Sequence, residues 1–279
     1  MKRCPRCNTP LPEEARFCWQ CGAVQPVVSD AASEPMRVEL GGNLEQQLFE
    51  LFFAALKGRI EREHHPDQLS LYSERLYASG FRDTVGRRTE QLAELIREMA
   101  ANGEATPREV NFLIDDLFED LLDFFIIRFC KDLNEEEYPE AILKYQYASL
   151  DTVNLLQLVL DYLQFDRESE EVYTDFLAMP VEKLKNVSKN FLFPAKDEKI
   201  LLISDHSLLG SGKEGFALTD RALYWKAPLQ KARFVAYPQI RDYRRTEDWI
   251  TINGFFFNVT PAINLRMLRL LSRLQRLFR

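Results

Sequence analysis

Apolar residues recur at helical spacing through the middle of the chain. Between about residues 43 and 190 they return every three or four positions, which is the period of an amphipathic helix. Thr106-Pro107 is typical of a helix start and Asn102-Gly103 of a helix end. The pattern predicts an acidic all-α domain over 43–190, with helices at 43–63, 67–79, 82–102, 107–133, 138–165 and 169–190.

From about residue 191 the pattern changes to short runs rich in β-branched and aromatic residues. These runs predict six strands, at 199–204, 214–219, 222–226, 232–237, 249–253 and 255–260, followed by a helix over 261–278. Asn253-Gly254 is the strongest hairpin signal among the turns between them. Residues 190–193 are a candidate for one more strand at the start. Residues 191–279 are therefore expected to form a small β-barrel or sandwich closed by a helix.

The start of the chain follows neither pattern. Residues 27–42 have no usable periodicity and contain proline, serine and acidic residues, so they are expected to be a linker. Residues 1–26 are too few to own an apolar core. The chain as a whole is predicted to be a multidomain α plus β protein with a small N-terminal module.

Four of the five cysteines stand in two CxxC pairs within that module. Cys4 and Cys7 form the first pair, and Cys18 and Cys21 the second, ten residues later. Two such turns supply the four thiolates of a tetrahedral zinc site. Pro10 and the shortness of the segment argue against a thioredoxin-like redox unit. The spacing predicts one structural zinc ion, and four protein ligands leave no open position for catalysis.

The segment MKRCPRCNTPLPEEARFCWQCG resembles the N-terminal zinc ribbons of many bacterial proteins. These ribbons typically read CPxCG, then a proline-containing loop, then FCxxCG. Asn8 stands where the family usually has glycine, and Trp19 where proline is common. The resemblance implies a metal-stabilised module.

A second resemblance lies in the last third of the chain. Its carrying residues run from Gly215 to Trp225, which include the letters LTDRALYW, and from Tyr237 to Ile240. They are similar to bacterial PH-like (GRAM-like) domains. That resemblance implies a seven-stranded barrel with a C-terminal helix plugging one open end. It also implies binding of lipid headgroups or proteins rather than catalysis.

Charge is distributed unevenly over these regions. Residues 1–26 carry +2, residues 27–190 carry −16 and residues 191–279 carry +7, which together give the net charge of −7. The acidic body argues against nucleic acid as a partner, whereas the C-terminal region alone is basic.

The final predicted helix carries four arginines at spacings of three, four and three, so they share one face: Arg266, Arg269, Arg273 and Arg276. Leucines occupy the opposite face. The arginines either form a solvated surface or bind an anion or an acidic partner. A counterpart exists on the helix that begins at Pro107, where acidic residues from Asp115 to Asp123 share a face. If the two surfaces met, the acidic domain would mask the arginines.

Catalytic side chains are scarce. The histidines are His64, His65 and His206, and Cys130 lies in an apolar helical pattern, so no nucleophile and base are placed together. We therefore expect a non-enzymatic recognition or scaffolding protein that binds a protein partner or an anionic membrane surface through its PH-like domain. The alternatives are a nucleic-acid-associated zinc-ribbon regulator and an enzyme whose site is hidden in the helical domain. No small-molecule substrate is expected.

The location of the protein is predicted from two further features. The sequence contains no run of 18 apolar residues, the length needed to span a bilayer. Its start, Met-Lys-Arg-Cys-Pro, lacks the apolar segment of a signal peptide. A cytoplasmic protein is expected, with peripheral attachment to the inner face of the membrane as an option.

Overall fold

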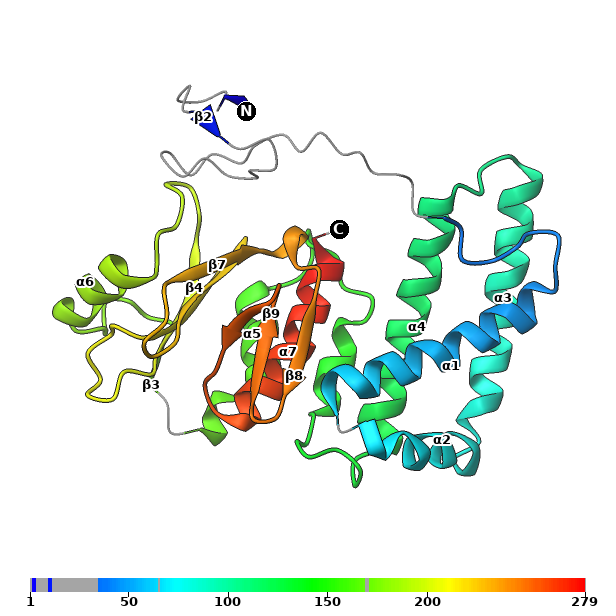
Figure 1. Cartoon of the computed structure of the whole chain (residues 1–279), viewed down its shortest axis with the longest axis horizontal. Coiled ribbons are helices and arrows are strands. Elements are labelled where there is room, and N and C mark those ends of the chain that lie inside the picture. Colours follow the sequence, from blue (N-terminus) through cyan, green and yellow to red (C-terminus); the bar gives the residue numbers. More distant parts are fainter. Residues whose placement is uncertain (1, 4–9, 12–34, 65, 169–170, 279) are drawn as a thin grey trace.

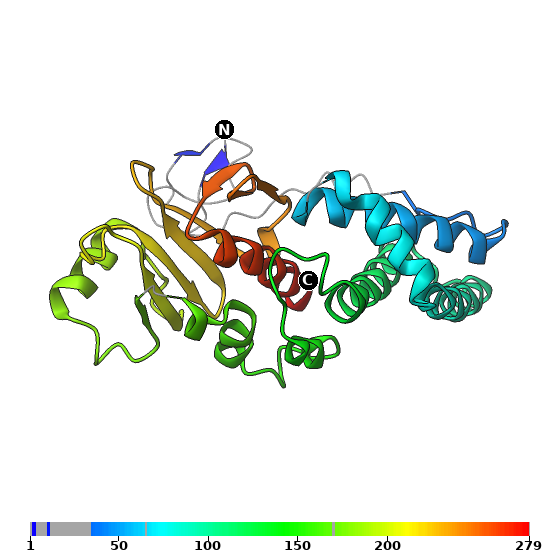
Figure 2. The ribbon, with the colours of Figure 1, turned by 90° about the horizontal axis from the view of Figure 1, so that it is seen from below.

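The computed structural model describes residues 2–3, 10–11, 35–64, 66–168 and 171–278. A helical bundle lies at one end of the molecule and a five-stranded sheet at the other, with the C-terminal helix and a three-stranded sheet between them (Figures 1 and 2). The mixture of a helical region and C-terminal antiparallel sheets agrees with the fold class predicted from the sequence.

The bundle consists of α1 (Leu44–Glu63), α2 (Leu69–Ala78), α3 (Phe81–Ala101) and α4 (Pro107–Phe129), with the short 3₁₀ helix η1 (Pro66–Gln68) before α2. These four helices confirm the prediction to within a few residues at each end. The Thr106 side chain accepts a hydrogen bond from the Glu109 amide, which satisfies one free donor at the start of α4. Inward-facing side chains such as Leu48, Phe52 and Ile96 are fully buried in one apolar cluster.

The next two predicted helices are largely wrong. In place of a helix over 138–165 the chain forms η2 (Glu140–Tyr145), α5 (Leu155–Leu163) and η3 (Phe165–Arg167). In place of a helix over 169–190 it forms β3 (Glu171–Tyr173) and α6 (Val181–Asn190). Asn154 caps α5 and Pro180 precedes α6, so each helix starts later than its apolar pattern suggests. β3 has only three residues, which give too little alternation for a strand to be predicted in place of the helix.

All strands of the C-terminal region pair antiparallel, in two sheets. The five-stranded sheet has the order β3, β4 (Ile200–Asp205), β5 (Gly215–Thr219), β6 (Ala222–Lys226) and β7 (Arg233–Ala236). The three-stranded sheet has the order β10 (Phe255–Phe257), β9 (Trp249–Ile252) and β8 (Tyr243–Thr246).

The six predicted strands are all present, with shifted ends. The extra strand is β8, and the candidate at 190–193 is wrong because Asn190 ends α6 and Phe191 caps it. The final helix α7 (Pro261–Leu277) is confirmed. Asn253 and Gly254 both have positive φ, as the tight turn between β9 and β10 requires.

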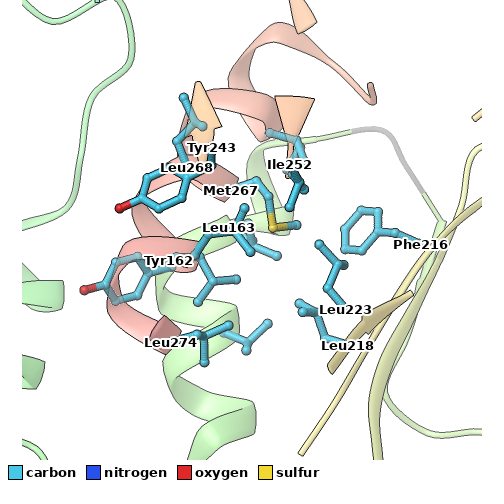
Figure 3. Close-up of a cluster of buried hydrophobic side chains, with 14 of the residues drawn as sticks. Tyr162, Leu163, Phe216, Leu218, Leu223, Tyr243, Ile252, Met267, Leu268 and Leu274 are labelled. Atoms are coloured by element: carbon cyan, nitrogen blue, oxygen red, sulfur yellow. The ribbon is translucent and has the colours of Figure 1, made fainter. Parts of the chain in front are cut away.

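The predicted single closed barrel is not what the described residues form. None of their strands pairs across the two sheets. After β7 the chain passes through η4 (Tyr237–Gln239) before starting β8, which separates the sheets. Side chains of α5 and α7 fill the space between them, as Figure 3 shows for Leu163 and Met267, which lie on the side of Phe216 and Leu223.

The five-stranded sheet is covered on both faces. Leu218 and Leu223 point into the cluster shared with α5 and α7, whereas Ala217 and Tyr224 pack in a second cluster with Val187 of α6. Residues on both faces of β5 are therefore buried, from Gly215 to Thr219.

The change from one main apolar cluster to the other comes earlier than the predicted boundary at residue 190. The bundle cluster ends at Cys130, and from Tyr138 onward buried side chains pack with the sheets and α7. Ile127 of α4 is the bundle helix residue that joins the second cluster. We call residues 138–278 the C-terminal unit below.

Candidate functional sites

Only residues 2–3 and 10–11 of the predicted zinc module are described. β1 (Lys2–Arg3) and β2 (Pro10–Leu11) pair antiparallel and flank the first CxxC pair in the sequence. Cys4, Cys7, Cys18 and Cys21 lie outside the described residues. Their donor set fits zinc, since four thiolates can close a tetrahedral site. Within the described part of the chain, no three or more His, Cys, Asp or Glu side chains group in a way that could hold a metal ion.

The predicted arginine face of α7 meets the acidic face of α4. Arg269 Nη1 lies 2.6 Å from Asp123 Oδ1, and Ser272 Oγ donates to Glu119 Oε2 at 3.0 Å. Residues further along α7 contact residues earlier in α4, so the two helices run antiparallel along this contact. Arg276 Nη2 completes the contact at 2.5 Å from Asp116 and 2.8 Å from Asp120.

Two charged residues of α1 complete this network. Arg59 donates to Glu119 and Asp123, and its Nε lies 2.6 Å from Glu63. The other Glu63 oxygen lies 2.9 Å from Arg269 Nε. Arg59, Glu63 and Arg269 are almost completely buried. We call the ion pairs among α1, α4 and α7 the clasp.

The clasp separates the pKa values of its carboxyl groups. Burial raises the pKa of Glu63 to about 7 and that of Asp123 to about 6, against the opposing attraction of Arg59. Burial also opposes ionisation of Glu119, but Arg59 and Arg62 outweigh it and hold the pKa of Glu119 at about 2. Protons and arginines therefore compete for the same buried carboxylates close to neutral pH.

The other two arginines of α7 bind within the C-terminal unit and the segment before it. Arg266 pairs with Glu136 and Glu168 and donates to the Leu163 carbonyl. Arg273 donates to the Ala148 carbonyl. These contacts fix α7 against the chain on either side of α5.

The solvated-surface interpretation of the arginines is wrong. Arg266 and Arg269 are 2% exposed and Arg273 is 4% exposed. The predicted binding of an external anion or partner stays a prediction, because in this structure the acidic partner is the chain's own helix α4. The acidic face of that helix was the sequence signal for the contact.

A different surface lies at one end of the five-stranded sheet. The β4–β5 and β6–β7 connections lie at the same end because neighbouring strands alternate in direction. Leu208 and Leu209 at the first are 97% and 89% exposed, and Leu229 at the second is 100% exposed. Residues of both connections line one surface depression of about 450 Å³. We call this surface the leucine loops.

The first leucine loop is held rigidly at its base. Buried Asp205 accepts hydrogen bonds from the amides of Ser207 and Gly212, at 2.9 Å and 3.1 Å, and pairs with Lys183 at 2.9 Å. Burial opposes ionisation of Asp205, but these bonds keep its pKa below the usual value. Gly212 has φ +70°, and a Cβ there would lie 2.8 Å from the Lys183 carbonyl, so only glycine fits.

The second leucine loop holds a strained residue. The Gln230 amide bonds the Ala227 carbonyl to close a turn, with Pro228 and Leu229 at its centre. Leu229 has φ +60°, a conformation that costs a non-glycine residue about 1–2 kcal/mol. Lys213 and Lys231 are exposed in the two loops. Gly210-Ser211-Gly212 and Ala227-Pro228 predict turns in the two segments, but nothing in the sequence indicates that their leucines are exposed.

Two groups that could suggest catalysis are buried. Ser204 Oγ lies 2.8 Å from His206 Nε2, but Ser204 is completely buried and cannot reach a substrate. Burial raises the pKa of Cys130 to about 12, so its thiol stays protonated.

Comparison with protein families gives one match, at the start of the chain. Residues 3–24 match the zinc-ribbon domain family. The match supports the predicted zinc module and a role for zinc, and it extends no further into the chain. Searches of curated proteins and of solved structures found no significant match. In the described ranges, every helix is too short or too polar to cross a membrane.

Proposed function

We propose that this protein is a non-enzymatic recognition protein that attaches peripherally to anionic membrane surfaces through its leucine loops. The observation that carries the proposal is the near-complete exposure of Leu208, Leu209 and Leu229 on two adjacent loops. Exposed apolar clusters of this kind mark interaction sites. The first loop is held by the contacts of buried Asp205 and the second by the hydrogen bond that closes its turn, so the leucines are exposed in the folded chain as it stands.

The architecture of the C-terminal unit supports the same proposal. Strands β4 to β10 and then α7 give seven strands and a closing helix, in a four-plus-three arrangement extended at one edge by β3. This order agrees with the resemblance to PH-like domains, for which recognition of lipids or proteins is the expected role. A PH-like fold is therefore part of the proposal.

The two kinds of side chain in the loops would contribute differently. Transfer of a leucine from water to an apolar environment is worth about 1.5–3 kcal/mol. Lys213 and Lys231 would attract anionic headgroups at the rim of the same surface. Strain at Leu229 supports a functional role, because glycine would occupy its backbone conformation at less cost.

We infer that the zinc ribbon is a separate structural module held by Cys4, Cys7, Cys18 and Cys21. Purified protein is expected to contain about one zinc ion per chain. Cys18→Ser should lose that zinc while the rest of the chain keeps its thermal unfolding transition, because the described residues from Met36 onward form two large apolar clusters of their own. Metal-free wild-type protein with reduced thiols would contradict this inference.

Vesicle co-sedimentation tests the membrane proposal. Wild-type protein should bind vesicles containing phosphatidylglycerol more tightly than pure phosphatidylcholine vesicles. Leu208→Ser with Leu209→Ser should weaken binding at least about tenfold, since two apolar anchors are lost. Lys213→Gln with Lys231→Gln should mainly reduce the salt dependence.

The matched control replaces two exposed leucines of the bundle. Leu71→Ser with Leu95→Ser removes similar side chains from α2 and α3, and it should leave vesicle binding unchanged. An equal loss of vesicle binding in both double variants would show that the binding does not depend on the leucine loops. Failure of the wild-type protein to bind any anionic vesicle would overturn the proposal. If the leucines were instead needed to bind a protein and no vesicle, the partner would be a protein and not a membrane.

A further inference from the structure

Helix α4 covers the arginine face of α7 in the way that a bound acidic helix would. Four of its carboxylates lie at spacings of three, one and three residues, and all contact the arginines or the serine of α7. Ion pairs and one hydrogen bond connect the two helices at this point. The two large apolar clusters are separate, and Ile127 near the C-terminal end of α4 is the buried bundle residue that belongs to the other cluster.

An interface of this composition is specific but not strongly held. Removing ion pairs from water costs about as much as their mutual attraction returns, so they define which surfaces meet more than they stabilise the contact. Charged groups of an external helix could replace those of α4 at little net cost. An apolar interface of the same size would give a competitor no such opportunity.

Only part of the arginine face could be exchanged. Arg266 and Arg273 bond to the segment 136–168 and would stay in place if α4 moved away. Arg269 and Arg276 have their carboxylate partners on α1 and α4. Separation of the bundle would expose these two guanidinium groups with Ser272 between them.

We infer that the face formed by Arg269, Ser272 and Arg276 is a docking site for an acidic amphipathic helix of a partner protein, and that α4 is its internal competitor. The partner helix carries carboxylates at the spacing of Asp116, Glu119, Asp120 and Asp123. This site is distinct from the leucine loops and does not depend on membrane binding. A membrane-attached copy could recruit such a partner.

Weakening the internal competitor tests the inference in the full chain. The probe is a fluorescent helical peptide with four glutamates at the spacing of the α4 carboxylates on an alanine scaffold. Asp116→Asn with Asp120→Asn leaves the arginines intact but removes the negative charge from both carboxylate partners of Arg276. Fluorescence anisotropy should then show at least tenfold tighter peptide binding than to the wild-type chain, and adding Arg276→Gln should abolish the gain.

Two controls separate docking from a general charge effect. Glu45→Gln with Glu50→Gln removes two charges from the opposite end of the bundle and should give no gain. A glutamine version of the peptide should bind none of the chains. Asp116→Asn alone, at the half-exposed edge of the clasp, should give an intermediate gain if the double variant unfolds.

Three results would overturn the inference. The first is equal peptide affinity of the Asp116→Asn/Asp120→Asn chain and its charge-matched control. The second is equal binding of the acidic and glutamine peptides. The third is concentration-dependent dimerisation of the double variant without peptide binding, which would assign the face to α4 of a second copy.

Discussion

The clasp arginines of α7 and the leucine loops lie on the same C-terminal unit, yet their side chains meet opposite surroundings. Arg269 of the clasp is almost completely buried, whereas Leu229 of the loops is completely exposed. Each side chain is placed against its own solvation preference, and each placement has a visible support. The arginine has carboxylates on α1 and α4, and the leucine stands on a closed turn.

The comparison shows that exposure depends on what the fold brings opposite a side chain. A buried charge requires a partner and then becomes hard to remove alone. An exposed apolar side chain needs no partner to be tolerated, so it contributes little to stability and is available for binding. Substitutions in the clasp should therefore change stability strongly, and substitutions in the loops should change binding.

Arg59→Ala is expected to have the largest effect on stability. It leaves Glu63, Glu119 and Asp123 without the cation they share, and breaking a buried ion pair from one side costs about 3–5 kcal/mol. Urea unfolding at neutral pH measures the change. Arg97→Ala, which breaks the exposed pair with Glu45, should leave the midpoint nearly unchanged. Equal effects of the two substitutions would show that burial of the clasp does not matter.

The pH dependence of stability should come next in size. The pKa of folded Glu63, about 7, lies above its ordinary value of 4.5, so between these pH values the folded chain holds a proton that the unfolded chain has released. Stability from this group is present below that window and is lost as pH rises through it. Asp123, raised to about 6, acts in the same direction, and Glu119 stays ionised throughout.

Glu63→Gln should remove most of that slope. With about 1.4 kcal/mol per unit of pKa shift, the difference between pH 5 and pH 8 is on the order of 2–3 kcal/mol in the wild-type chain. Urea midpoints of both proteins at the two pH values give the comparison. A wild-type protein that is more stable at pH 8 than at pH 5, with no change on substitution, would contradict the raised pKa.

Features set by local chemistry could be predicted from the sequence. The cap at Thr106 and the turn at Asn253-Gly254 depend on a few adjacent residues, and both are present. Strand β8 was missed because its signal is not local. Tyr243 is its one buried side chain, and Arg245 is paired with Glu135 from 110 positions away. A pattern that alternates only weakly gives no strand signal.

The candidate sites follow the same division. The cysteine spacing alone indicated a zinc ribbon, and a family model matches there. Helical periodicity placed the four arginines of α7 correctly on one face, but burial depends on carboxylates such as Asp123, 146 positions away. No local pattern could distinguish a solvated face from a buried one. The sequence gave no indication of the positive φ of Leu229, because that conformation is imposed by the turn and leucine rarely adopts it.

Leu229→Gly should stabilise the protein while weakening membrane binding. Glycine relieves a left-handed conformation but loses more entropy on folding, which leaves a gain of about 0.5–1 kcal/mol. Asn253→Gly is the contrast, because Asn253 also has positive φ but bonds the amide of Arg241 and the Gln239 carbonyl. That substitution should destabilise the protein, because these hydrogen bonds of the Asn253 side chain are lost. Thermal unfolding and vesicle co-sedimentation together check both signs, and unchanged vesicle binding of Leu229→Gly would remove the functional reason for its strain.

Leu208→Ser with Leu209→Ser should have the smallest effect on stability, although it is expected to have a large effect on vesicle binding. Both side chains are already in water when the protein is folded, so the free energy of unfolding should change by less than about 0.5 kcal/mol. Leu218→Ser, in the fully buried part of β5, should cost several times more because it removes packing and buries a hydroxyl group. Urea unfolding of the three proteins makes the comparison. A large loss of stability in the loop variant would mean that the two leucines pack against the protein, and the surface proposed for membranes would then be part of its core.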